Sequence, residues 1–281
     1  MPRAALLSAR NIAKAWLLLA GTCAVLGLAG WLIGGYRSLT ICVFSGLLLG
    51  VGAYFSFDRA ILGMTGAREL LPGEAPALHS AVERLAARAN VVKPRLCLIP
   101  DGHPRAFATG RGPTSSTIVV SSGLLSVTTP AELEAVLAHE LAHVRHRDVL
   151  LQSVAVVAAV ALIELSRIGG FLERGLLFVL GPVAAAVVHL LLSPGRELAA
   201  DRAAAALCES PHGLADALIR LETASELVQF RASPATEPLY TMNPFAEEGL
   251  AALFVSHPPV GDRIQRLRAL DPTWRSRLQA A

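Results

Sequence analysis

Two apolar stretches without a charged residue stand out near the start of the chain, from Ala15 to Gly35 and from Ser38 to Ser56. Only Tyr36 and Arg37 separate them. Each stretch has about 20 residues, the length at which a helix crosses a hydrocarbon core of ~30 Å. The pattern therefore predicts a transmembrane hairpin over residues 15–57.

The basic residues around this hairpin predict its orientation. Arg and Lys occur within residues 1–14, and Arg59 and Arg68 follow the second stretch, whereas the turn between the stretches carries only Arg37. Positive charge favours the cytoplasmic side, so residues 1–14 are predicted to be a cytoplasmic N-terminal tail. A secretory signal peptide is the alternative, but the first stretch exceeds the usual ~7 to 15 apolar residues and a second stretch follows at once.

Residues 58–148 have the pattern of a globular segment and are predicted to lie in the cytoplasm. Apolar positions at helical spacing predict a helix over Ala77 to Ala89. A small β-sheet is expected next, because three strand-like runs follow, with Pro, Gly and Ser between them. The runs are Arg95 to Ile99, Ala106 to Thr109 and Thr117 to Ser121.

A strong helix start follows the predicted sheet. Thr129 has the position of an N-cap, Pro130 that of the first helical residue, and Glu132 lies three residues after Thr129. This spacing is typical of a capping box, in which the two side chains satisfy backbone N–H groups of the first turn. The helix is expected to continue into the apolar stretch Val149 to Ile163.

A second apolar stretch, Gly175 to Leu192, completes a predicted transmembrane hairpin over residues 149–193. Val149 to Ile163 would be only ~22 Å long as a helix, so it needs flanking apolar residues or local thinning of the bilayer to span. A helical hairpin buried inside the protein is the alternative. Residues 194–281 return to a charged, helical pattern and are predicted to lie in the cytoplasm, with a basic helix near Arg263 to Leu270.

The composition agrees with a membrane protein. Hydrophobic residues make up 53% of the chain and charged residues 17%, and the mean hydropathy is +0.50. The formal net charge of +3 gives no case for a nucleic-acid partner. The four cysteines show no paired or CxxC spacing, so we interpret them as reduced packing residues.

The segment His139-Glu140-Leu141-Ala142-His143 carries the candidate chemistry. Histidines four residues apart share one face of a helix, so both can bind one zinc ion at ~2.1 Å. Zinc lowers the pKa of a bound water, and Glu140 is placed to take its proton and pass it to the leaving amine. The motif predicts a metalloprotease with one Zn²⁺ per chain.

A catalytic zinc site normally has a third protein ligand. His146 lies on the same stripe but ~10.5 Å along the helix axis from His139, too far to share the metal, and a solvated or membrane-interface position is expected for it. Glu197 is the better candidate, because it lies at a predicted helix start with Asp201 one turn later. Asp201 can then accept a hydrogen bond from a ligand histidine. A solvated helix face is the alternative for this pair.

At these residues the chain resembles the HtpX-type membrane zinc endopeptidases, relatives of the CAAX prenyl proteases. Four ordered motifs carry the resemblance over nearly the whole length: Ala106 to Gly110, His139 to His143 with Arg147-Asp148, Arg196 to Asp201, and Ser256 to Pro259 with Arg263-Ile264. The resemblance implies that Glu197 is the third ligand and that two membrane hairpins flank the active-site helix. It also implies that the substrates include damaged or misfolded membrane proteins.

The resemblance suggests further site residues. His257 and Arg263 would lie near the metal with transition-state or gating roles; a loop end and a surface helix are the alternatives. Ala106, Phe107, Ala108 and Thr109 are predicted to form an edge strand whose backbone pairs with an extended substrate. Arg105 stands where the family usually has Asn, which puts a side-chain contact with substrate in doubt; a basic residue there also guards an edge strand against aggregation.

These observations predict an α-rich α+β integral membrane metalloprotease, in which the HEXXH helix and the Glu-bearing helix pack on a small β-sheet and four segments cross the membrane. Its partners would be polypeptide substrates, chiefly membrane proteins, and the lipid bilayer. It would lie in the cell (inner) membrane with its active site in the cytoplasm, acting in protein quality control. A zinc-containing adaptor or holdase is the non-enzymatic alternative, although a structural site would not need Glu140. A transporter would carry ionisable residues inside the first two stretches, and there are none.

Overall fold

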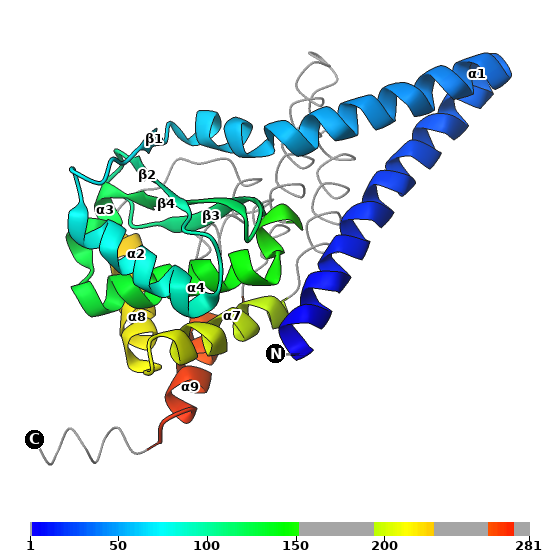
Figure 1. Ribbon diagram of the computed structural model, residues 1–281. Helices are drawn as coiled ribbons and strands as arrows, with labels where there is room; N and C mark the ends of the chain where they lie inside the picture. The colour runs from blue at the N-terminus through cyan, green and yellow to red at the C-terminus, as the bar shows by residue number, and fades with distance from the viewer. Residues whose placement is uncertain (1, 152–193, 228–257, 273–281) are drawn as a thin grey trace, which may run out of the picture.

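The computed structural model of the protein describes residues 2–151, 194–227 and 258–272 (Figure 1). A four-stranded sheet is surrounded by helices, so the predicted α-rich α+β fold with a small sheet is confirmed. The helices are α1 (Pro2–Thr65), α2 (Pro76–Ala89), α3 (Ser122–Val127), α4 (Pro130–His146), α7 (Pro194–Leu207), α8 (His212–Leu227) and α9 (Val260–Ala269). The strands are β1 (Arg68–Glu69), β2 (Arg95–Ile99), β3 (Ala106–Gly112) and β4 (Ser115–Ser121).

Helix α1 consists of two arms that form a V in Figure 1, with the sheet and α4 between their free ends. The kink lies at Gly34 and Gly35, whose backbones are not helical; Gly35 has a φ of 65°, which favours glycine because it has no Cβ. The kink comes one residue before the predicted turn at Tyr36 and Arg37. The region predicted as a cytoplasmic tail, residues 1–14, is helical from Pro2 and belongs to the first arm.

Apolar side chains of α1 are exposed along both arms; the large ones include Trp16, Leu17, Trp31, Leu32, Phe44, Leu48 and Phe55. Within the described ranges, no helix is both long enough and apolar enough to cross a membrane. Most of the second predicted hairpin, residues 149–193, lies outside the described residues.

The sheet has the strand order β1-β2-β4-β3, in which β2 pairs parallel with β4 and the other two pairs are antiparallel. Alternate residues of a strand point to opposite faces. Ala106, Ala108 and Ile118 belong to the main core with α2 and α4, whereas Phe107 and Val119 pack with Ile61 of α1. The sheet therefore lies between the second arm of α1 and the helix that carries the HEXXH residues (Figure 1).

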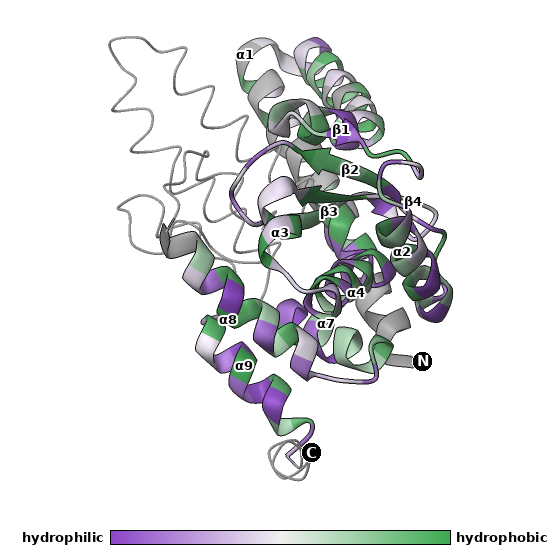
Figure 2. Ribbon diagram, turned by 90° about the vertical axis from the view of Figure 1, so that its left-hand side faces the viewer, coloured by the Kyte–Doolittle hydropathy of each residue, from purple (hydrophilic) through white to green (hydrophobic). Residues whose placement is uncertain are grey.

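The elements agree closely with the sequence predictions. Strand β2 has the predicted bounds, helix α2 begins one residue earlier, and β3 and β4 each extend beyond the predicted runs. The predictions missed β1 and α3, because such short elements depend on contacts with distant segments. In Figure 2 strand β2 is largely green, hydrophobic, whereas the outer helix α9 is mostly purple.

Helix α4 begins as predicted and ends earlier than predicted. The capping box at Thr129 and Glu132 is present in both directions. The expected continuation into residues 149–163 is wrong, because Arg147 adopts the left-handed conformation with a φ of 59° and ends the helix at His146. A new helical segment starts at Asp148. The break turns Asp148 back towards the face of α4 that carries the histidines.

Candidate metal centre

The HEXXH helix and its neighbour bring three potential metal ligands together. Residues His139 and His143 lie one turn apart on α4, and Glu197 lies in the first turn of α7, which packs against α4. All three side chains are buried. The two Nε2 atoms of the histidines are 3.2 Å apart, and each lies 3.4 Å from an oxygen of Glu197. Within the described residues, these three form the only such group of potential ligands.

The spacing of these ligand atoms fits a zinc ion. Tetrahedral ligands at ~2.1 Å from a common centre are about 3.4 Å from one another, close to the separations found here. The other ring nitrogens, Nδ1 of His139 and His143, each lie 3.0 Å from a carboxylate oxygen, of Asp201 and Asp148 respectively. A carboxylate can accept a hydrogen bond from Nδ1–H, which leaves Nε2 of each ring facing the shared point, where it can bind a metal.

Asp201 connects His139 to Arg263. Its Oδ1 lies 3.0 Å from Nδ1 of His139 and accepts a 2.7 Å hydrogen bond from a terminal nitrogen of Arg263, whose Nε donates to Oδ2 at 2.9 Å. Burial opposes ionisation of this carboxyl, but His139 and Arg263 outweigh it and lower its pKa to about 2. Arg263 is fully buried, so the alternative interpretation that it is a residue of a surface helix is wrong. The structure brings both residues to the metal centre.

Asp148 has the corresponding position beside His143, a role that was not predicted for it from the sequence. Its Oδ2 lies 3.0 Å from Nδ1 of His143, and its Oδ1 is 3.2 Å from Nε of Arg196. Burial alone would raise the pKa of Asp148. Arg196 and His143 outweigh burial and lower the pKa below its usual value, which keeps the carboxylate charged. The signal was available: metal-binding histidines need a partner for their second nitrogen, and Asp148 is an acid close to His143 in the sequence.

Of the remaining histidines and acids considered from the sequence, some are buried near the metal centre and one lies outside the described residues. Glu140 is buried on α4 beside His139. Burial alone would lower the pKa of Arg263, but Asp201 raises it, with smaller contributions from Glu197 and Glu140. His146 is not part of the ligand group, as predicted, but it is buried, so its expected solvated position is wrong. Burial lowers its pKa. His257 lies outside the described residues.

The predicted substrate strand, Ala106 to Thr109, forms the first half of β3. In the described part of the chain, β3 is the last strand of the sheet, next to β4, and pairing of this strand with a substrate stays a prediction. It packs against α4, the helix with the metal ligands. Arg105, just before β3, pairs with Asp101.

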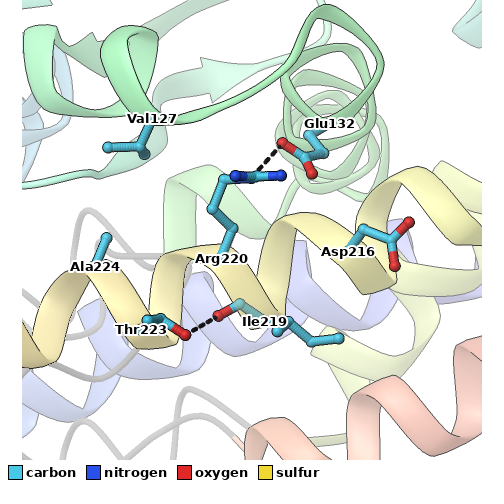
Figure 3. Close-up of a pocket in the computed structure, with 7 residues that line it drawn as sticks. All are labelled: Val127, Glu132, Asp216, Ile219, Arg220, Thr223 and Ala224. Atoms are coloured by element: carbon cyan, nitrogen blue, oxygen red, sulfur yellow. Dashed lines mark hydrogen bonds and ion pairs between the residues drawn. The ribbon is translucent and has the colours of Figure 1, made fainter.

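A hollow of about 680 Å³ lies elsewhere, along α8 and beside the start of α4 (Figure 3). Glu132 of the capping box accepts a 2.8 Å hydrogen bond from Arg220 there. Glu132 is seven residues before His139, about 10 Å along the helix. This hollow is therefore separate from the metal centre.

Metal binding should release protons. Burial alone would lower the pKa of His143, but Glu197 and Asp148 raise it to about 10, and the carboxylates of Asp201 and Glu197 also raise the pKa of His139. His143 is thus protonated near neutral pH without metal, whereas a ligand imidazole must be neutral. We expect at least one proton released per zinc bound at pH 7.5, measured by titration calorimetry in buffers of different ionisation enthalpy. Binding heats independent of the buffer would contradict this.

The fold and the centre define a class of protein. A HEXXH helix and a glutamate from the next described helix, converging on one buried point beside a small sheet, are the features of a metal-dependent protease. The chain belongs to peptidase family M48, whose family model matches residues 72–271.

Similar proteins agree with the predicted resemblance, which is confirmed. A protease HtpX homolog from Pelotomaculum thermopropionicum is 37% identical over 92% of this chain and 99% of its own length. One from Syntrophobacter fumaroxidans is 38% identical over 90% of this chain and 97% of its own length. The crystal structure of S. mikatae Ste24p matches 95% of this chain and 66% of that chain with a TM-score of 0.48 and 20% identity.

Proposed function

We propose that this protein is a zinc-dependent endopeptidase of the cell membrane that hydrolyses peptide bonds of misfolded or damaged membrane proteins. The observation that carries the proposal is the set of separations at the metal centre, 3.2 Å between the histidine nitrogens and 3.4 Å from each to Glu197. Such distances suit ligands of one metal ion, with Glu140 beside them on the same helix. Membership of a peptidase family supports the reaction type.

The residues of the chain then have distinct roles. Bound zinc supplies Lewis-acid chemistry, polarising the scissile carbonyl and lowering the pKa of the attacking water. Glu140 accepts the proton of that water and donates it to the leaving amine. Asp201 orients His139, and Arg263 fixes Asp201 through two hydrogen bonds while placing a positive charge near Glu140. A direct contact of Arg263 or His257 with the transition state stays a prediction.

Hydrolysis is tested with the purified, detergent-solubilised protein and casein as an unfolded substrate. Mass spectrometry of the products should show internal cleavage, because an endopeptidase does not need free chain ends. A chelator should stop cleavage, and zinc should restore it. Loss of single residues from the ends only, or cleavage unaffected by the chelator, would contradict the proposal.

We further propose that an extended substrate pairs with the backbone of Ala106 to Thr109. The support is the edge position of β3 and its packing against α4. An extended peptide can add to the edge strand of a sheet through backbone hydrogen bonds, and such pairing gives broad sequence specificity.

Backbone pairing predicts that the effect of modifying the substrate backbone alternates from one residue to the next. N-methylation of one peptide nitrogen removes a hydrogen-bond donor, and successive N–H groups of a strand point to opposite edges. In a series of substrate peptides methylated at one position each, KM should rise at alternate positions and stay near the unmethylated value between them. Equal effects at all positions would reject pairing with β3.

The membrane assignment is also a proposal, and residues 15–57 and 149–193 are its two hairpins. It is supported by the uncharged runs of both regions and by the exposed aromatic and aliphatic side chains on both arms of α1. Because His143 and Glu197 meet at one centre, the chain between them must return to the side from which it left. The catalytic residues are proposed to lie in the cytoplasm, since the positive charges flank the first hairpin on that side.

The second hairpin gives a topological prediction. Cysteines introduced at Gly169 and Gly170, between its two apolar stretches, should react with an impermeant thiol reagent from the non-cytoplasmic face of intact cells. The measurement compares intact cells with inverted membrane vesicles. Labelling from the cytoplasmic face alone would exclude the four-span arrangement and favour the buried hairpin.

A further inference from the structure

The first arm of α1 contacts the end of α4 through one buried polar side chain. Asn11 donates from Nδ2 to the backbone oxygen of His146 at 3.2 Å and to Oδ1 of Asp148 at 2.6 Å. Its exposed fraction is 7% although the helix around it carries exposed residues. In Figure 1 this end of α1 lies beside α7, which carries Glu197.

The contact bridges the break that ends α4. The carbonyl of His146 is in the last turn of the helix, where backbone oxygens have no N–H partner four residues on. Arg147 then turns the chain in its left-handed conformation, and Asp148 follows. Asn11 hydrogen-bonds the residue before Arg147 and the residue after it, and so fixes the position of Asp148 relative to His146.

Asp148 transmits that arrangement to a metal ligand. Its two oxygens have separate partners: Oδ1 is near Asn11 and Arg196, and Oδ2 is near Nδ1 of His143. Rotation of the carboxylate would break all three contacts together. Partners of this kind fix the ring orientation of a metal-binding histidine and raise its affinity for the metal.

We propose that Asn11 is a positioning residue for His143, acting through Asp148, so that the seating of the first arm of α1 determines how tightly zinc is held. The proposal rests on the proposed function, since it requires that the centre binds zinc. The arm that carries Asn11 continues into the apolar run from Ala15. Displacing this arm from the catalytic part therefore weakens the zinc site.

The test measures zinc affinity by competition with a coloured chelator in four detergent-solubilised proteins: wild type, Asn11→Leu, Asp148→Asn and the double variant. Leucine resembles asparagine in size but donates no hydrogen bond. Asp148→Asn should weaken binding by ~10 to 100-fold, and Asn11→Leu should weaken it by up to about tenfold. In the double variant, Asn11→Leu should add nothing, because the carboxylate that it positions is gone.

Thr40→Val is the matched control. Thr40 is also a polar residue of α1, but its hydroxyl bonds only the carbonyls of Tyr36 and Arg37 in its own helix, so wild-type zinc affinity is expected. If Asn11→Leu does not fold, Asn11→Ala replaces it in the same measurements, because the smaller side chain cannot clash.

Three outcomes overturn the proposal in distinguishable ways. Wild-type zinc affinity in the Asn11 variant shows that the contact has no effect on the centre. Additive losses in the double variant show that Asn11 stabilises the fold without acting through Asp148. If the wild-type protein binds no zinc, both the proposed function and this inference are wrong.

Discussion

Glu140→Gln should keep its zinc and lose peptide hydrolysis. Glutamine has nearly the shape of glutamate, and Glu140 is not one of the three converging ligands, so the metal should remain bound. The amide cannot accept a proton from the attacking water, and a positioned general base contributes ~10² to 10⁴ in rate. We expect kcat to fall by about 10² to 10⁴-fold, measured on an internally quenched peptide alongside the zinc content.

Glu134→Gln is the control for that experiment. Glu134 is on the same helix, and its carboxylate forms a long ion pair of 3.8 Å with Arg84. This variant should retain both zinc and activity. If Glu140→Gln turns over substrate within tenfold of the wild type, Glu140 is not the base. If the wild type and Glu140→Gln were both inactive, the adaptor or holdase alternative would be favoured.

Glu197→Ala should lose zinc far more severely than Asp201→Asn. The first variant removes one of three ligands, whereas the second leaves all three and changes only the group that orients His139. Changes in such orienting groups typically cost ~10 to 100-fold in affinity or activity, and removal of a ligand should cost more. Zinc content after dialysis, and affinity by chelator competition, give the two values.

A control on the same helix isolates the effect of Glu197. Arg202 is exposed on α7 one residue after Asp201, so Arg202→Ala should bind zinc as the wild type does. Asn is preferred to Ala at Asp201, because Arg263 is fully buried and its charge would be left without the residue that it binds. Full zinc stoichiometry and unchanged activity in Glu197→Ala would end its assignment as a ligand.

Local sequence patterns predicted the elements well, because the causes of those elements are local. The start of α4 was predictable because Thr129, Pro130 and Glu132 satisfy its first turn themselves. The bounds of β2 followed from a short apolar run with proline before it. The end of α4 was not predictable in this way, since apolar residues continue beyond Arg147 and only the structure shows its left-handed backbone.

The centre was predictable to the extent that its members lie in short motifs. The HEXXH spacing identified His139 and His143 as a pair, and the helix start around Glu197 suggested a third ligand. The partners of these residues depend on contacts between distant segments. Asn11 and Asp148 are 137 residues apart in the chain yet 2.6 Å apart in space, and no spacing rule connects them.

The most direct test of the account is a titration of the metal-free enzyme with zinc, with peptide cleavage measured after each addition. Three converging ligands predict no cleavage without metal, a linear rise up to one equivalent of zinc per chain, and a plateau beyond it. Full cleavage by the metal-free protein, or a zinc-loaded protein that cleaves nothing, would contradict the central claim that this centre is a catalytic zinc site.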